Sequence, residues 1–139
     1  MKTVFLDSSV LFTAVNSPVG GSAKLFTLKN IELITSKIVL VEVERNIRRK
    51  LLDYHLERFF LLVDRIKILD IKFNKSNVKK AKKIIVKKDI IILSQVKISK
   101  PDFLLTLDKK HFLQEKVINY VKPTKILTPK DFLNSSYSL

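Results

Sequence analysis

The sequence contains no cysteine and no tryptophan, and its 139 residues include only two glycines, four prolines and two histidines. Without cysteine the chain has neither disulfides nor thiolate metal sites, a composition that suits the reducing cytoplasm. The two histidines, His55 and His111, do not have the spacing of a metal-binding pair. Any bound metal would therefore have to rest on carboxylates, which favour hard cations such as Mg²⁺ or Mn²⁺.

Long hydrophobic runs are missing as well. Asp7 interrupts the run that follows Lys2, which leaves it too short for the hydrophobic region of a signal peptide. No other run approaches the length of a membrane span, so we expect a cytoplasmic protein without a membrane segment. Hydrophobic residues still make up 46% of the chain, enough for a real core. We expect one domain over residues 1–134 and a frayed tail over 135–139.

Acidic residues are scarce relative to basic ones, and the formal net charge is +14. Residues 1–70 contain 11 basic and 8 acidic residues, whereas residues 71–139 contain 16 and 5. The segment 72–88 has eight lysines and no acid. Such a field attracts polyanions such as nucleic acids, although a run of this kind is more often only a solvated helix face. The candidate nucleic-acid contacts are Lys79, Lys80, Lys82, Lys83, Lys87 and Lys88.

Apolar segments of strand length alternate with helical patterns along the chain. This alternation predicts an α/β sandwich with a mainly parallel sheet. The predicted strands are 3–6, 31–35, 66–71, 102–107 and 124–128, and the predicted helices are 8–15, 22–29, 37–52, 55–66, the lysine-rich stretch, 88–98 and 109–121.

Two acids directly follow predicted strands. Asp7 comes after the strand "TVFL", and Asp108 comes after "DFLLTL". Ligands bind beyond the carboxyl ends of the strands in an open parallel sheet. One such aspartate is most simply a helix N-cap, but two at the same edge of one sheet favour a site.

A third acid is selected by helical periodicity. In "IVLVEVERNIRR" the valines and isoleucine that face the core recur every four residues, and Glu42 and Glu44 lie about 200° apart around the helix. Glu44 can pair with Arg48 at the surface, so Glu42 is the better site candidate. Asp89 is the fourth candidate, at the start of the helix in "DIIILSQV", where a capping role is the simpler interpretation.

In this order the motifs "FLDSSVLF", "SKIVLVEVERNI", "KDIIILSQ" and "PDFLLTLDKKHF" resemble those of the PIN-domain family. The resemblance extends from residue 3 to residue 133. It implies a three-layer α/β/α sandwich and, for many members, a Mg²⁺- or Mn²⁺-dependent ribonuclease, including toxins of type II toxin–antitoxin pairs. It assigns catalysis and metal binding to Asp7, Glu42, Asp89 and Asp108, with Ser8, Ser9 and Thr106 as supporting polar residues. It makes Asp102 a possible fifth metal ligand, although the place of Asp102 at the other end of the strand from Asp108 favours a structural or peripheral role.

The hypothesis is a metal-dependent nuclease that hydrolyses RNA, with RNA, a small antitoxin and a second copy of the chain as the partners that the family implies. A non-catalytic PIN-like module that binds RNA or a protein is the main alternative. A phosphohydrolase with Asp7 as nucleophile would need another acid two residues later, where the chain has Ser9. A response-regulator receiver would need a paired early acid and a central phospho-acceptor strand, neither of which the sequence offers.

Overall fold

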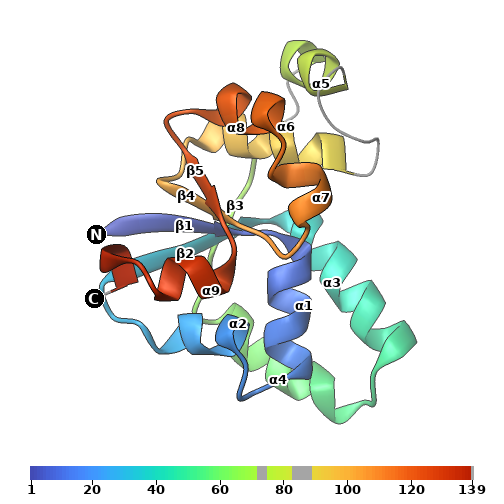
Figure 1. The fold of residues 1–139 in the computed structure, drawn as a ribbon. Coiled ribbons are helices and arrows are strands. Elements are labelled where there is room, and N and C mark those ends of the chain that lie inside the picture. Colours follow the sequence, from blue (N-terminus) through green and yellow to red (C-terminus); the bar gives the residue numbers. More distant parts are fainter. Residues whose placement is uncertain (72–74, 83–88, 139) are drawn as a thin grey trace.

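The computed structural model describes residues 1–71, 75–82 and 89–138. Its strands form one parallel sheet in the order β3-β2-β1-β4-β5, as the alternation of segments predicts (Figure 1). The strands are β1 (Lys2–Leu6), β2 (Ile31–Ser36), β3 (Lys67–Leu69), β4 (Phe103–Leu105) and β5 (Lys125–Leu127).

Helices cover both faces of the sheet (Figure 1). On one face α1 packs against α2, α3 and α4, and on the other α6 packs against α5 and α8. The three-layer α/β/α architecture is therefore confirmed. The helices are α1 (Ser8–Asn16), α2 (Gly21–Lys24), α3 (Lys37–Lys50), α4 (Tyr54–Val63), α5 (Lys75–Lys82), α6 (Ile90–Ser99), α7 (Lys109–Phe112), α8 (Glu115–Val121) and α9 (Pro129–Leu133), with 3₁₀ turns η1 (Leu25–Thr27) and η3 (Ser136–Ser138).

The central strand β1 explains why "TVFL" is uniformly apolar. Val4, Phe5 and Leu6 are fully buried because helices cover both faces of the strand, so neither set of alternating side chains reaches water. Leu6 lies opposite Leu105 of β4 in the ladder. This register brings the residues that follow the two strands, Asp7 and Thr106, to the same edge of the sheet.

The prediction of one continuous helix over 109–121 is wrong, because the structure has two helices there, α7 and α8. The backbone N–H of Leu113 closes α7 by donating to the carbonyl of Lys109 at 3.1 Å. Gln114 is then extended, with φ −87° and ψ 144°, and α8 starts at the next residue. The short helix α9, which the sequence patterns do not predict, is capped by Thr128, whose hydroxyl accepts from the Asp131 N–H at 3.1 Å.

The end of the chain, expected to fray, contains the 3₁₀ turn η3. Its Tyr137 packs on Phe103, with ring centroids 4.8 Å apart, and accepts a hydrogen bond from Lys125 at 2.8 Å. None of the helices in the described part of the chain is long and apolar enough to span a bilayer.

Candidate active site

The four predicted acids come together at the carboxyl edge of the sheet. Asp7 follows β1, Asp108 lies just beyond β4, Glu42 projects from α3 and Asp89 precedes α6. All four line one cleft of about 340 Å³. The other residues of its lining are Ser8, Ser9, Phe12, Asn46 and Lys50.

Both carboxylate oxygens of Asp7 accept hydrogen bonds. Its side chain is 3% exposed, and its Oδ1 accepts from the backbone N–H of Ser8 at 2.8 Å, so the residue is also the N-cap of α1. Its Oδ2 accepts from the hydroxyls of Ser9 at 2.9 Å and Thr106 at 2.8 Å. Asp7 therefore caps α1 and at the same time lines the cleft.

Burial raises the pKa of the Asp7 carboxyl above its ordinary value. Hydrogen bonds from Thr106, Ser9 and Ser8 oppose this change in part, and the nearby charge of Asp108 adds to it. The charged form of Asp7 is therefore less favourable in the folded protein than in water, and a bound cation would offset this cost.

Thr106 joins two of the acids. It is fully buried, donates its hydroxyl to Asp7 and accepts the backbone N–H of Asp108 at 3.0 Å. Ser9 is used in a similar way, because its hydroxyl donates to Asp7 and accepts from the backbone N–H of Leu107 at 3.1 Å. These contacts hold the ends of β1 and β4 together at the base of the cleft.

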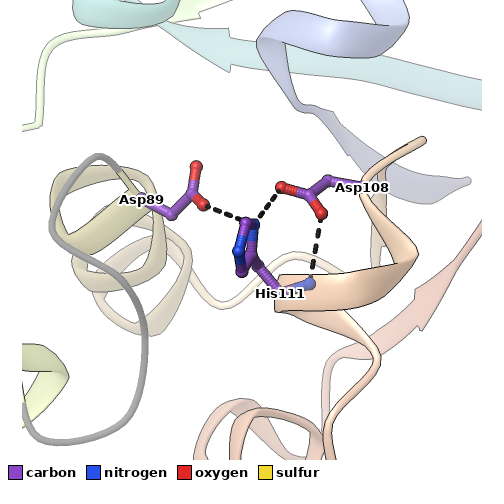
Figure 2. A group of neighbouring side chains, drawn as sticks. All are labelled: Asp89, Asp108 and His111. Carbon is purple, nitrogen blue, oxygen red and sulfur yellow. Dashed lines mark hydrogen bonds and ion pairs between the residues drawn. The ribbon is translucent and has the colours of Figure 1, made fainter.

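Asp108 and Asp89 lie on either side of His111 (Figure 2). Asp108 caps α7, with its Oδ1 accepting the backbone N–H of His111 at 3.1 Å. The Nδ1 of His111 lies 2.8 Å from Asp108 Oδ2 and 3.7 Å from Asp89 Oδ2. One ligand atom from each of the three residues lies within 4.8 Å of the others.

Sequence reasoning missed His111, which was considered only as a partner for His55. The available signal was its place three residues after Asp108, the spacing at which an N-cap carboxylate meets the first turn of its helix.

The helix α3 presents a polar stripe to the cleft. Glu42, Asn46 and Lys50 are spaced by four residues and all line it, whereas Glu44 pairs with Arg48 at 3.4 Å, as predicted. Lys50 also has its Nζ 5.9 Å from the centroid of the Phe12 ring. Asn46 and Lys50 were absent from the predicted site, although their spacing from Glu42 was a readable signal.

The helix that carries Glu42 is tied to α6, the helix that Asp89 precedes. Ser36 caps α3 and accepts from the Val39 N–H at 3.4 Å. The same hydroxyl donates to Gln95 of α6 at 2.6 Å. This buried hydrogen bond connects α3 in one helical layer with α6 in the other. It therefore helps to fix the position of Glu42 relative to Asp89.

The structure does not bring Asp102, the possible fifth ligand, to the cluster. The strand β4 separates it from Asp108, and Asp102 lies at the opposite edge of the sheet beside Thr3. Its Oδ2 accepts from the Thr3 backbone N–H at 2.8 Å and hydroxyl at 3.1 Å. The backbone hydrogen bond is the largest cause of its lowered pKa. Asp102 therefore serves the structure of this edge.

Of the predicted nucleic-acid contacts, Lys79, Lys80 and Lys82 are exposed on α5. This helix packs against α6, which begins beside Asp89. Lys83, Lys87 and Lys88 lie outside the described residues.

The donor set fits a divalent cation. Carboxylates from four separate elements meet in one cleft, and the buried Asp7 is unfavourable as a lone charge. Oxygen donors of this kind hold Mg²⁺ or Mn²⁺, and the imidazole of His111 adds a nitrogen within reach of two of them.

A protein-family model described as "PIN domain" matches residues 4–116. The chain belongs to the PIN domain family. The match spans all four acids of the cleft and confirms the resemblance on which they were assigned.

Solved structures with the same fold include VapBC2 from Rickettsia felis bound to a DNA fragment from their promoter, with a TM-score of 0.71 and 16% identity. The match covers 91% of this chain and 98% of that one. VapBC-1 from nontypeable Haemophilus influenzae matches with a TM-score of 0.60 and 15% identity, covering 92% and 98%. At these identities the likeness concerns the fold. No curated protein matches the sequence.

Proposed function

We propose that this PIN domain is a divalent-metal-dependent endoribonuclease. The observation that carries the proposal is the convergence of Asp7, Glu42, Asp89 and Asp108, from four elements, on one cleft. These carboxylates would hold Mg²⁺ or Mn²⁺. When bound, such an ion lowers the pKa of a water, aligns it with a phosphodiester and offsets the developing charge.

The chain's own residues prepare the cleft for this chemistry. Ser9 and Thr106 hold Asp7 Oδ2 from two sides, which keeps its carboxylate oriented. Lys50 lies in the cleft wall together with Glu42, where its ammonium can bind a phosphate oxygen. The acids alone would repel RNA, so Lys50 and the lysines of α5 supply the attraction that the site needs.

We further propose that the protein acts in the cytoplasm and is held inactive by a small antitoxin that covers the cleft. The family resemblance implies such a partner, and the likeness in fold to the two VapBC structures supports it. Pairing of two copies of the chain is proposed on the same family basis.

The direct test uses purified protein and a complex pool of single-stranded RNA. We expect cleavage with Mn²⁺ or Mg²⁺, complete loss of cleavage with EDTA, and recovery when excess metal is restored. We also expect Mn²⁺ to raise the melting temperature. A non-catalytic PIN-like module without a metal site would show neither cleavage nor stabilisation, and that result would refute the proposal.

The α5 lysines provide a separate prediction about substrate binding. Replacing Lys79, Lys80 and Lys82 together with glutamine should weaken binding of single-stranded RNA about tenfold or more at low salt. Each lost phosphate contact should reduce the slope of log K against log salt by about 0.7, a total of about 2. Filter binding across a salt series measures both quantities.

A matched triple variant controls for net charge. Lys24, Lys29 and Lys130 are exposed, and α2 and α9, which carry two of them, lie away from α5 (Figure 1). Their replacement by glutamine removes the same charge and should leave the slope nearly unchanged. Equal losses in the two triple variants would show that the α5 lysines make no specific contact.

A further inference from the structure

The cluster of Asp89, Asp108 and His111 has a feature that the four-acid site does not require. The ligand atoms are one nitrogen and two oxygens, all within 4.8 Å of one another. Ligands of one ion held at about 2.1 Å lie up to about 4.2 Å apart, so a small side-chain adjustment would bring all three to a common cation. The His111, Asp89 and Asp108 side chains are 19%, 11% and 23% exposed, and the two aspartates line the cleft.

We infer that His111 is itself a metal ligand through Nδ1, and that the site selects a first-row transition-metal ion over Mg²⁺. The inference rests on the proposed function, because it concerns the cation of the same cleft. It adds a nitrogen donor to the set of oxygens and thereby changes which ion binds best.

Holding Asp108 in place does not require the imidazole. The Asp108 carboxylate already accepts the backbone N–H of His111, and its own N–H donates to Thr106. The Nδ1 contact is a further one, and Figure 2 shows the ring between the two aspartates, with Nδ1 reaching both.

The imidazole can bind Asp108 in the metal-free protein and an ion in the metal-bound protein, because its proton can move between the two ring nitrogens. In the protein alone, Nδ1–H donates to Asp108 Oδ2 at 2.8 Å. The ring can instead carry its proton on Nε2, a tautomer that leaves the Nδ1 lone pair free to bind an ion.

The expected consequence is a change in selectivity. Mg²⁺ prefers oxygen and gains little from an imidazole, whereas Co²⁺ and Ni²⁺ gain affinity from nitrogen and exceed Mn²⁺ in the usual order of stability. A site with carboxylates alone would show a smaller preference for Co²⁺ over Mg²⁺ than this one.

The test compares Co²⁺ and Mg²⁺ binding by calorimetry in tag-free protein, with His111→Asn and His111→Ala as variants. Asparagine keeps an N–H donor close to the position of Nδ1, so it preserves the contact with Asp108 and removes only the imidazole nitrogen. We expect His111→Asn to lower Co²⁺ affinity about tenfold or more and Mg²⁺ affinity by less than about twofold. The same loss should follow in His111→Ala, together with loss of the histidine features from the absorption spectrum of bound Co²⁺.

His55→Asn is the matched control, because His55 is the other imidazole of the chain and its Nδ1 contacts the Leu52 carbonyl instead. It should leave Co²⁺ affinity unchanged. Equal Co²⁺ affinity in wild type and His111→Asn would overturn the inference, and so would a His111→Ala variant that loses both ions equally while His111→Asn loses neither. In those cases RNA cleavage supported by Mg²⁺ would leave the proposed function standing, whereas a wild-type protein that binds no divalent ion would refute both.

Discussion

Asp7→Asn should reduce metal-dependent RNA cleavage at least about a hundredfold while leaving the protein folded. Asparagine has almost the same shape and keeps an oxygen for the Ser8 N–H that caps α1. It removes one negative charge from the base of the cleft, where Asp7 is buried and close enough to Asp108 for the two charges to interact. Cleavage rates of the two proteins at saturating Mn²⁺ measure the effect.

Asp102→Asn is the matched control for this substitution. It makes the same chemical change beside the neighbouring strand, but at the opposite edge of the sheet, where the carboxylate contacts Thr3. Its cleavage rate should stay within about twofold of wild type. Similar losses in the two variants would show that the effect of Asp7→Asn is not specific to the cleft.

The difference in melting temperature between wild type and Asp7→Asn should depend on pH. Burial raises the pKa of Asp7 in the folded state, so the folded protein holds that proton more tightly than the unfolded chain. In metal-free protein, the contribution of Asp7 to stability is therefore present at low pH and is lost as the pH rises through the raised pKa. The melting temperature of Asp7→Asn relative to wild type should accordingly increase with pH above the ordinary value of 3.8. A relative melting temperature that falls with pH would contradict the assigned direction.

Thr106→Val should damage both stability and metal binding. Valine has the shape of threonine but removes a fully buried hydroxyl that donates to Asp7 and accepts from the Asp108 N–H. The loss of these hydrogen bonds should lower the free energy of unfolding by about 1–3 kcal/mol. Because the hydroxyl orients two of the acids, Mn²⁺ affinity should fall about 10- to 100-fold.

Thr106→Ser separates the hydroxyl from the packing of the methyl group. Serine keeps both hydrogen bonds, so Mn²⁺ affinity should be close to that of wild type even if the free energy of unfolding falls slightly. Denaturant unfolding and calorimetry measure the two effects. If valine and serine weaken Mn²⁺ binding equally, the hydroxyl does not position the acids.

Much of the fold follows from patterns in the chain. The run "TVFL" is apolar without alternation because β1 is central and covered on both faces. The break between α7 and α8 was not predictable in the same way. No glycine or proline marks it, and Gln114 is a residue that helices accept, so the ending of α7 depends on tertiary context.

The sequence predicts the position of those site candidates that depend on strand direction. Asp7 and Asp108 follow parallel strands, and parallel strands bring their carboxyl ends to one edge. The same rule puts the start of β4, and with it Asp102, at the far edge, which agrees with the structural role that the sequence favours for this residue over that of a fifth ligand. The contact of His111 with Asp108 was available from their spacing of three residues, whereas its contact with Asp89 was not, because Asp89 comes from a different element and local spacing carries no information about such contacts.

The central claim is that the four carboxylates of the cleft bind a divalent ion and that RNA cleavage by the protein depends on this ion. The most direct measurement follows the RNA cleavage rate of wild type, Asp7→Asn and Asp102→Asn across one Mn²⁺ titration, with Mn²⁺ occupancy measured in the same samples. The rate should rise and saturate with occupancy in wild type and Asp102→Asn, and stay at background in Asp7→Asn. Cleavage by wild type that persists in EDTA, or equal rates in wild type and Asp7→Asn, would contradict the account.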